Sequence, residues 1–454
     1  MNLLDFIMFF VYIIIFYILF AWRRKKYKDP VLRKYHRQGF WIKVFSSFAY
    51  SIFILYFSPG DSNGLYHREG YNIYELILKD ASNIDLLFIS GKDFDQALLA
   101  NVYNAGYFGE ESNYMVTRIV AVLSFVTFGR FLAINLIFSM ISFTGVWRLY
   151  RFFYEQYPDL HKQFAIAILY LPSFVFWSSG ILKDPLCTGA LGWITYSLYA
   201  MFYKKKNPLI YIPILLLFSY LLIVIKVYII LSYVPFFSLY LLLLNVTLIK
   251  NRFVKIFLVG SVLLGSVLGF VTITNAMQKA LGNYASAGVS QSIKSYQTNY
   301  ENQAGSATSN FSLGVEFDGS VQSLIRMAPA AVIATLFRPY IWESKKPSTF
   351  MSSLESLALM FFTIFVLIKV GIKKFILTIF NKPMVLYCIF FSVIFALFVG
   401  ATTLNFGSLV RYKIPALPFY VIGLYFILYF NNKMKIKPRE NAGQVVSSLT
   451  VINS

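Results

Sequence analysis

Four charged side chains stand close to a glycine or a proline in an otherwise apolar chain: Asp61, Asp184, Arg338 and Arg411. Glycine and proline mark turns and helix ends. A carboxylate that is partly removed from water can accept a proton from a hydroxyl group. An arginine can bind two oxygens of a phosphate through its planar guanidinium and stabilise a departing negative charge. These residue types are the ones that acid–base and phosphate chemistry require.

The elements that position these residues are predicted to be membrane helices. The chain has 454 residues, of which 58% are hydrophobic, and its mean hydropathy is +0.62. Many apolar runs have about the 17 to 25 residues that cross a bilayer as a helix. A closed β-barrel would instead show short alternating segments. The composition therefore predicts an all-α polytopic membrane protein.

The basic residues predict the orientation of the chain. The first apolar run, Leu3 to Trp22, is followed by a basic segment at residues 23–38 and by no small-residue cleavage site. Under the positive-inside rule, residues 23–38 lie in the cytoplasm and the N-terminus lies outside. The formal net charge of +21 then reflects short Lys and Arg clusters between apolar runs, so no nucleic-acid partner is expected.

The apolar runs and basic clusters together predict about eleven transmembrane helices, with the C-terminus in the cytoplasm. The third run ends near Arg151, after a surface-lying helix and a break at residues 129–130. The other ten runs are 3–22, 40–57, 163–182, 186–203, 208–225, 227–249, 256–277, 355–369, 384–402 and 414–430. The chain is thus divided into helices 1 and 2 in 1–57, an external loop in 58–118, helices 3 to 8 in 119–277, a second external loop in 278–350, helices 9 to 11 in 351–432 and a basic cytoplasmic tail in 433–454.

The two external loops differ in character. The first holds nine carboxylates against three basic residues up to Thr117, and it carries Asp61. The second has a first half rich in Ser, Asn, Gln and Gly with no apolar period. Its second half contains an apolar stretch, residues 326–337, that is too short for a span. This stretch is expected to form a re-entrant or interfacial helix.

In this topology the unusual polar residues lie at the outer boundary between membrane and water. Ionisable groups near membrane depth are costly and usually face a cavity or a partner, so their convergence predicts a site. Alternatively, they are ordinary interface anchors that extend toward water, which is the expected role of Lys226. The residues concerned are Asp61, His67, Arg68, Glu69, Lys183, Asp184, Lys226, Arg338, Trp342, Glu343, Asn405, Arg411, Tyr412 and Lys413.

Three stretches resemble the GT-C membrane glycosyltransferases, a superfamily that includes protein O-mannosyltransferases and lipid A aminoarabinose transferases. The first is residues 59–61, Pro-Gly-Asp, in the loop where that superfamily carries an Asp. The second is residues 172–184, similar to its proline-containing helix with an exposed Asp. The third is residues 411–418, similar to the Arg-Tyr and proline signature that opens a late helix. The last two stretches also resemble exopolysaccharide and O-antigen polymerase-type proteins.

The resemblance implies a polyprenyl-phosphate-linked sugar donor and either transfer of one sugar or polymerisation of repeat units. The reaction would take place at the external face of the plasma (inner) membrane. Asp61 and Asp184 would be the catalytic acids, with Asp61 as the general base. The donor phosphate would be bound by Arg338, Arg411, Lys413 and Lys183. The acceptor, a glycan, lipid or protein, would be bound by His67, Arg68, Glu69, Trp342, Glu343 and Tyr412.

The sequence favours a site without a resident metal or other cofactor. The first-loop Asp of the superfamily is commonly followed by a second acid, whereas Ser62 follows Asp61 here. A hard cation prefers several carboxylate ligands. Of the three histidines, His36 and His161 are expected in the cytoplasm, so a zinc site is not indicated. The sequence alone leaves a divalent metal open.

Two other functions share this pattern. A lipid-linked sugar flippase or polysaccharide exporter would place charged or broken-helix sites near the midplane of the membrane and often shows paired repeats. The expected spans have almost no charge at mid-depth and no internal repeat, which favours the enzyme. A non-catalytic assembly subunit would keep the pattern after losing one residue of the site. The sugar, the acceptor and the oligomeric state stay open.

Overall fold

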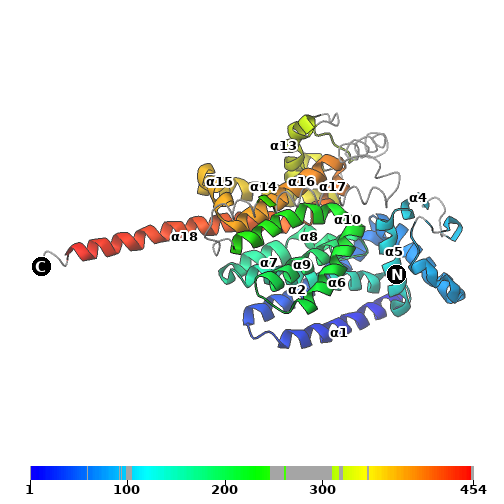
Figure 1. Ribbon diagram of the computed structural model, residues 1–454. Coiled ribbons are helices and arrows are strands. Elements are labelled where there is room, and N and C mark those ends of the chain that lie inside the picture. Colours follow the sequence, from blue (N-terminus) through cyan, green and yellow to red (C-terminus); the bar gives the residue numbers. More distant parts are fainter. Residues whose placement is uncertain are drawn as a thin grey trace.

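The structure is a computed structural model that describes residues 2–58, 60–91, 93, 95–98, 105–245, 260–261, 309–315, 321–344 and 347–450. These residues form α-helices with short 3-10 and π segments, and no β-strand occurs among them. Helices from distant parts of the chain lie side by side in one bundle (Figure 1). The all-α fold class predicted from composition is confirmed. The longest helices are α1 (Leu3–Lys25), α2 (Pro30–Tyr56), α6 (Phe131–Tyr154), α9 (Lys183–Phe202), α10 (Pro208–Asn245), α14 (Pro347–Val370), α16 (Pro383–Thr402) and α18 (Leu417–Thr450).

Six of the described helices, α1, α2, α6, α10, α14 and α16, are long and apolar enough to cross a membrane. A seventh candidate is the pair of α17 (Phe406–Tyr412) and α18, which meet at 61°. This number is smaller than the eleven spans expected. The long apolar helices are consistent with contact with a lipid bilayer.

Broken helices explain part of the difference in number. The expected run at 163–182 is divided into α7 (His161–Leu169) and α8 (Pro172–Trp177). Leu171 between them has extended backbone, because the residue before a proline is restricted away from the helical region. Helix α9 matches the expected run at 186–203 but is not among the six candidates. The run at 256–277 lies outside the described residues, apart from 260–261.

Helix α10 changes direction at Lys226, whose φ of −151° and ψ of 77° are not helical. On one side of the break, Phe218 stacks on Trp193 of α9 with ring centroids 5.7 Å apart. On the other side, the Tyr233 hydroxyl lies 2.6 Å from the hydroxyl of Thr195, two residues further along α9. Both halves therefore run back along α9, and the predicted turn at Lys226 is present in the structure.

Helix α6 lies at the centre of the bundle, where it packs against α1, α2, α7 and α9. Small residues bring α6 and α9 into backbone contact. A Cβ added to Gly145 of α6 would lie 1.8 Å from the carbonyl oxygen of Gly189. A Cβ added to Gly192 would lie 2.0 Å from the carbonyl oxygen of Gly145. Any side chain at these positions would push α6 and α9 apart. Because the positions are glycines, the two helices lie close enough for polar residues of α6 and α9 to meet.

The acidic first loop folds into helices of its own. A π-helical segment (Ser62–His67) leads into α3 (Arg68–Lys79), and α3 packs against α5 (Glu111–Thr127). The expected break after α5 is present, with Phe128 at φ 54° and Gly129 at φ 67°. This folded first loop, which we call the lobe, encloses a small separate core of Ile73, Ile77, Leu86, Phe108, Tyr114 and Ala121. Burial of these side chains orders the loop and fixes Asp61 at its base.

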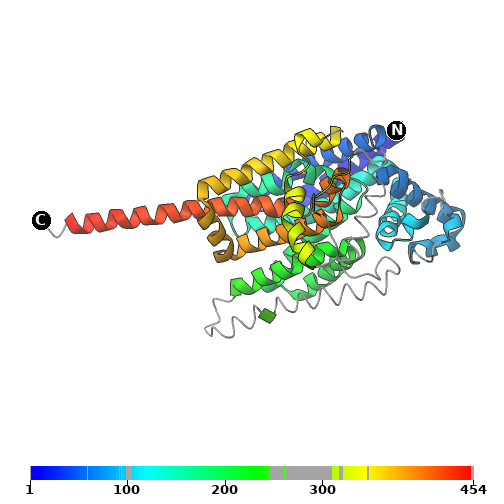
Figure 2. The ribbon, with the colours of Figure 1, turned by 90° about the horizontal axis from the view of Figure 1, so that it is seen from above.

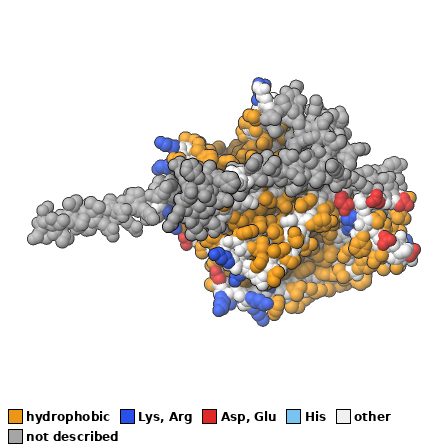
Figure 3. Space-filling model, viewed as in Figure 1, with side chains coloured by type: hydrophobic (Ala, Val, Ile, Leu, Met, Phe, Trp, Pro, Cys, Tyr) orange, Lys and Arg blue, Asp and Glu red, His pale blue; other side chains and the backbone are white. Residues whose placement is uncertain are grey.

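Charge is distributed unevenly along the bundle. The first-loop lobe and the N-terminus lie at one end, and α18 extends from the other (Figure 2). Acidic side chains gather on the lobe and basic ones at the opposite end, with an apolar surface between them (Figure 3). At the basic end, Arg151 lies over the ring of Tyr27, and Lys204 pairs with Glu155. The basic clusters used to predict the orientation therefore meet at one end.

The C-terminal part packs α13 (Val321–Phe337) against α16. The two backbones touch, since a Cβ on Gly400 would lie 2.2 Å from the carbonyl oxygen of Ala331. Helix α13 covers the short apolar stretch that was expected in the second loop. The sequence did not predict α15 (Ile372–Asn381), which follows Gly371 at φ 80°. The first half of the second loop lies largely outside the described residues.

Candidate functional site

A buried ion pair joins α9 to the break in α10. The ammonium of Lys226 donates to Oδ1 of Asp184 at 2.6 Å, and the two side chains are 6% and 1% exposed. Asp184 is the second residue of α9, where the positive end of the helix dipole favours a carboxylate. Lys226 can reach it because the backbone of α10 is interrupted there. A charge at this depth is held only by a well-placed partner.

Arg411 links this pair to the first loop. Its Nε lies 3.5 Å from Oδ2 of Asp184, and its Nη1 lies 3.6 Å from Oδ2 of Asp61. Arg411 stands in the last turn of α17, before the bend into α18. Asp61 precedes the π-helical segment and follows Gly60 at φ 44°. Three of the four residues from which the sequence argument started, Asp61, Asp184 and Arg411, thus form one cluster.

The two carboxylates of the cluster have different surroundings. Asp184 is 1% exposed and contacts two cations, so its oxygens are already engaged. The Asp61 side chain is 40% exposed and contacts Arg411 through one oxygen. A carboxylate must be within reach of an incoming hydroxyl to act as a general base. Of the two carboxylates, only that of Asp61 is open to an incoming molecule, and Asp184 is the group that holds Arg411 and Lys226.

Aromatic rings surround the charged groups. The Arg411 guanidinium carbon lies 5.6 Å from the ring centre of Trp177, and the Lys226 ammonium lies 4.5 Å from that of Tyr412. Tyr50 of α2 is fully buried and packs edge-to-face against Trp177. A Cβ on Gly180 would lie 1.9 Å from the Tyr50 ring, so only glycine fits there. These rings restrict access of water to Asp184 and Lys226, whose side chains are 1% and 6% exposed.

Lys183 lies next to the cluster and points to the first loop. Its ammonium donates to the hydroxyl of Ser112 at 2.8 Å. Burial and, to a smaller extent, the nearby charge of Lys226 lower the pKa of Lys183 to about 8. Lys183 therefore loses its positive charge as the pH rises through about 8. A lysine of this kind can bind a phosphate at neutral pH and release it at higher pH.

Two of the first-loop residues that were predicted to bind the acceptor form hydrogen bonds outside the cluster of Asp61, Asp184 and Arg411. His67 lies 2.8 Å from the carbonyl oxygen of Gly129, and burial lowers its pKa. Glu69 is buried and accepts from Asn72 at 3.5 Å, whereas Arg68 is exposed. A chain of hydrogen bonds lies on the lobe side of Asp61. The hydroxyl of Tyr107 donates to that of Tyr66, which donates to the side-chain oxygen of Asn113. Burial raises the pKa of both tyrosines, so both keep their protons.

Arg338 lies in a neighbouring cluster at the start of α17. Its guanidinium forms a fork with the carboxylate of Glu343, with Nε 3.0 and 3.1 Å from the two oxygens. It also lies over the rings of Phe311 and Phe406, at 4.5 and 5.2 Å. Lys413 donates to the backbone carbonyl of Arg338 at 3.1 Å. The structure does not bring Arg338 or Lys413 into ionic contact with Asp61, Asp184 or Arg411.

The remaining acceptor candidates are divided between these clusters. Trp342 is 79% exposed and stacks on Tyr340 with ring centroids 5.0 Å apart. Tyr412 belongs to the Asp184 cluster through Lys226. Among the described residues, no three His, Cys, Asp or Glu side chains are placed to hold a metal ion.

Sequence reasoning underestimated two lysines. Lys226 was expected to be an interface anchor, but it is 7% exposed and neutralises Asp184. The signal was a single lysine within an uninterrupted apolar run of about forty residues, which is costly unless it is paired. Lys43 was placed near the start of a span at 40–57, but α2 begins at Pro30, so Lys43 lies near its middle and is 3% exposed. Lys43 is therefore an ionisable residue near the middle of a candidate membrane span.

The chain matches no protein-family model, and no curated protein or solved structure is detectably similar to it.

Proposed function

We propose that this chain is a membrane glycosyltransferase that takes a sugar, or a repeat unit, from a polyprenyl-phosphate-linked donor. Its product belongs to cell-surface polysaccharide or glycoconjugate biosynthesis. One observation supports this proposal most directly: Arg411 stands between the accessible carboxylate of Asp61 and the buried carboxylate of Asp184. An arginine fixed along one edge and a carboxylate open to solvent are the groups that phosphate departure and hydroxyl attack require.

The chemistry assigned to the cluster is a single displacement at the anomeric carbon of the donor sugar. The acceptor oxygen forms a bond to that carbon while its proton moves to Asp61. The bond between the anomeric carbon and the phosphate oxygen breaks, and its electron pair stays on the phosphate. Arg411 stabilises this charge, with Lys183 beside it. Lys226 and Asp184 keep the guanidinium in place throughout.

The proposed orientation places the cluster at the external face of the plasma (inner) membrane. The basic segments 23–38 and 204–206 then face the cytoplasm, under the positive-inside rule. The N-terminus and the acidic lobe face outward, which agrees with their position at the same end of the bundle. A donor can then place its phosphate at the Arg411 cluster while its lipid chain stays in the bilayer.

The test of the function is the variant Asp61→Asn, which keeps the shape of the side chain and removes the proton acceptor. Loss of a general base lowers the rate by about 10² to 10⁴-fold. We therefore expect cells that carry Asp61→Asn to lose the glycan product while the amount of inserted protein is unchanged. Asp95→Asn, a change in an exposed acid of the same loop, is the matched control and should keep full output.

Asp184→Asn distinguishes the alternatives. If Asp61→Asn is active and Asp184→Asn is inserted in the normal amount but inactive, the base is Asp184 and the assignment changes. If both variants make the normal amount of product, the glycosyltransferase proposal is wrong. The flippase or exporter would then be the better account, and transport of a lipid-linked sugar across reconstituted vesicles would be measured instead.

A further inference from the structure

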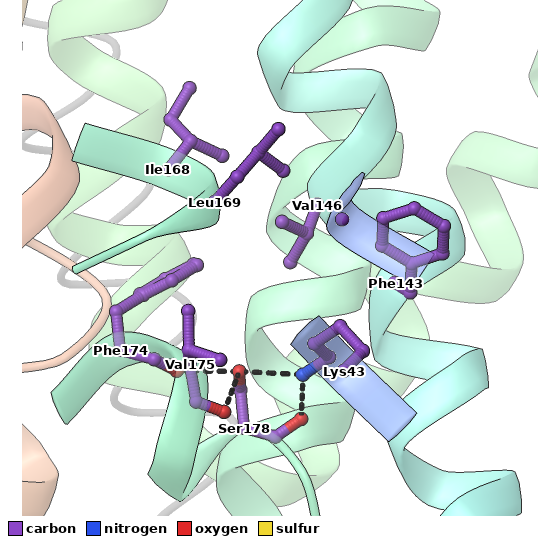
Figure 4. A pocket seen from close by; sticks show the side chains of 9 residues that line it. Lys43, Phe143, Val146, Ile168, Leu169, Phe174, Val175 and Ser178 are labelled. Carbon is purple, nitrogen blue, oxygen red and sulfur yellow. Dashed lines mark hydrogen bonds between the residues drawn. The ribbon is translucent and has the colours of Figure 1, made fainter. Parts of the chain in front are cut away.

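Lys43 is a buried lysine that the proposed mechanism does not use. Among the residues that the structure describes, it forms no ion pair with a carboxylate. Its ammonium instead donates to the carbonyl oxygen of Ser178 and, at 2.9 Å, to the hydroxyl of the same residue. Figure 4 shows these bonds at the edge of a small pocket that is otherwise lined mainly by apolar side chains. A lysine in such surroundings needs a structural reason.

That reason lies in the position of Ser178 directly after α8. The last carbonyl groups of a helix carry partial negative charge and lack partners within the helix. Lys43 supplies hydrogen-bond donors at this end of α8. The ammonium also lies 3.5 Å from the hydroxyl of Ser142 on α6. Lys43 thus connects the C-terminal end of α8 to α2 and α6.

The opposite end of α8 is held by a carboxylate. One carboxylate oxygen of Glu355, on α14, accepts from the backbone N–H of Ser173 at 2.8 Å. The other accepts from the hydroxyl of the same serine. Ser173 is the second residue of α8, where the helix carries partial positive charge. The six-residue helix therefore lies between a carboxylate at its N-terminus and an ammonium at its C-terminus.

Helix α8 needs such contacts because a helix of one or two turns is not stable by itself. Its last residue is Trp177, whose ring faces Arg411 at 5.6 Å. Six residues further, the chain reaches Lys183 and Asp184 at the start of α9. The hydroxyl of Thr188 connects Ser142, a contact of Lys43, to the start of α9. It lies 3.1 Å from the hydroxyl of Ser142 and donates to the carbonyl oxygen of Asp184 at 3.0 Å.

We propose that Lys43 and Glu355 are positioning residues for the Arg411 cluster, acting through α8. By fixing both ends of this helix, they set the place of Trp177 against Arg411 and the direction in which the chain enters α9. Their role in catalysis depends on the proposed function. Their effect on Trp177 does not, because it follows from the geometry of α8 alone.

The experiment compares Lys43→Met and Glu355→Gln with wild type in the full-length protein, purified in detergent. For each protein, the fluorescence of the same protein carrying Trp177→Phe is subtracted. The difference is the fluorescence of Trp177 without that of the other tryptophans. If α8 is fixed from both ends, each variant should increase quenching of Trp177 by acrylamide at least twofold. A second measurement, the rate of sugar transfer, should show a fall in kcat of about tenfold or more with KM nearly unchanged, as expected for misplaced catalytic groups.

Thr195→Val is the matched control, because Thr195 is a buried residue of α9 whose hydroxyl contacts Tyr233 far from α8. It should lower the melting temperature without changing the quenching of Trp177. The proposal is overturned if Lys43→Met and Glu355→Gln leave Trp177 quenching as in wild type, or if Thr195→Val raises it as much. If Lys43→Met does not insert, Glu355→Gln decides alone. If wild type has no transferase activity, the proposed function fails, while the quenching result still decides the role of α8.

Discussion

Two charged clusters lie at opposite ends of α9 and use the same residue types in different ways. At the start of α9, Asp184 contacts Lys226 and Arg411, which come from two distant parts of the chain. Near its other end, Glu155, which follows the last residue of α6, contacts Arg151 of α6 and Lys204. The Asp184 side chain is 1% exposed, whereas those of Glu155 and Lys204 are 12% and 33% exposed.

The difference separates a cluster that marks orientation from one that forms a site. Water can replace a lost partner at Glu155, and a local pair between residues i and i+4 contributes little to stability. At Asp184 a lost partner leaves a charge that water does not reach, and such a cluster persists only when its geometry is fixed by the surrounding helices. Four experiments test this contrast, from the largest expected effect to the smallest.

The largest effect should be seen in labelling with a membrane-impermeant thiol reagent. Cysteines at Ser82 in the acidic lobe and at Asn207 beside the basic cluster are both exposed. The native residues Cys187 and Cys388 are buried and should give little background. In intact cells we expect complete labelling of Ser82→Cys and none of Asn207→Cys. The opposite pattern would put the Arg411 cluster on the cytoplasmic side and contradict the proposed external site.

Removal of the carboxylate of Asp184 should destabilise the protein strongly, and removal of the carboxylate of Glu155 should destabilise it weakly. Asp184→Asn leaves the ammonium of Lys226 buried without a counter-charge, which costs about 3–5 kcal/mol. Glu155→Gln leaves Arg151 in contact with the hydroxyl of Tyr196 and Lys204 partly in water, so the loss should be about 1 kcal/mol or less. Unfolding of the two variants by denaturant in detergent measures both losses in the free energy of unfolding. Equal losses would show that burial does not distinguish the clusters.

Arg411→Lys should lower transferase activity while the protein still folds. Lysine keeps the positive charge but loses the planar fork, so one or more charged hydrogen bonds to the phosphate disappear. Each such bond is worth about 1.5–3 kcal/mol, which corresponds to roughly 10 to 100-fold in rate. Arg151→Lys makes the same change in the basic cluster and should leave activity within about twofold of wild type. Product formation in membranes measures both, and equal effects would remove the phosphate-binding role of Arg411.

The smallest effect concerns pH. The folded-state pKa of Lys183 is lowered to about 8, so its positive charge is present at pH 7 and is mostly lost at pH 9. If this charge assists donor binding, KM for the donor should rise by up to about tenfold between pH 7 and pH 9. The same depressed pKa makes folding more favourable as pH rises from about 8 toward the unfolded value of Lys183. Lys183→Met should raise KM at pH 7 and remove its increase with pH. A pH dependence that survives in Lys183→Met would have another origin.

The sequence alone was sufficient for the class of the protein and for a large part of its candidate site. Apolar runs of bilayer length require helices, because backbone groups in lipid must be paired within the segment. Charged residues beside proline or glycine identified Asp61, Asp184 and Arg411, because helices end there and polar groups can gather at helix ends. The break between α5 and α6 and the turn at Lys226 were also read correctly, since in each a polar or small residue interrupts an apolar run.

The tertiary structure decided which of these groups meet. Arg338 pairs with Glu343, five residues further along the chain, whereas Arg411 pairs with Asp184 of the distant helix α9. The partners of Lys226 and Lys43 could not be read from their neighbours in the chain, because they come from helices that are distant in sequence. The close crossing of α6 and α9 depends on three glycines that only become opposed when the helices pack. Ion pairing depends on distances of a few ångströms between distant segments, and packing sets those distances.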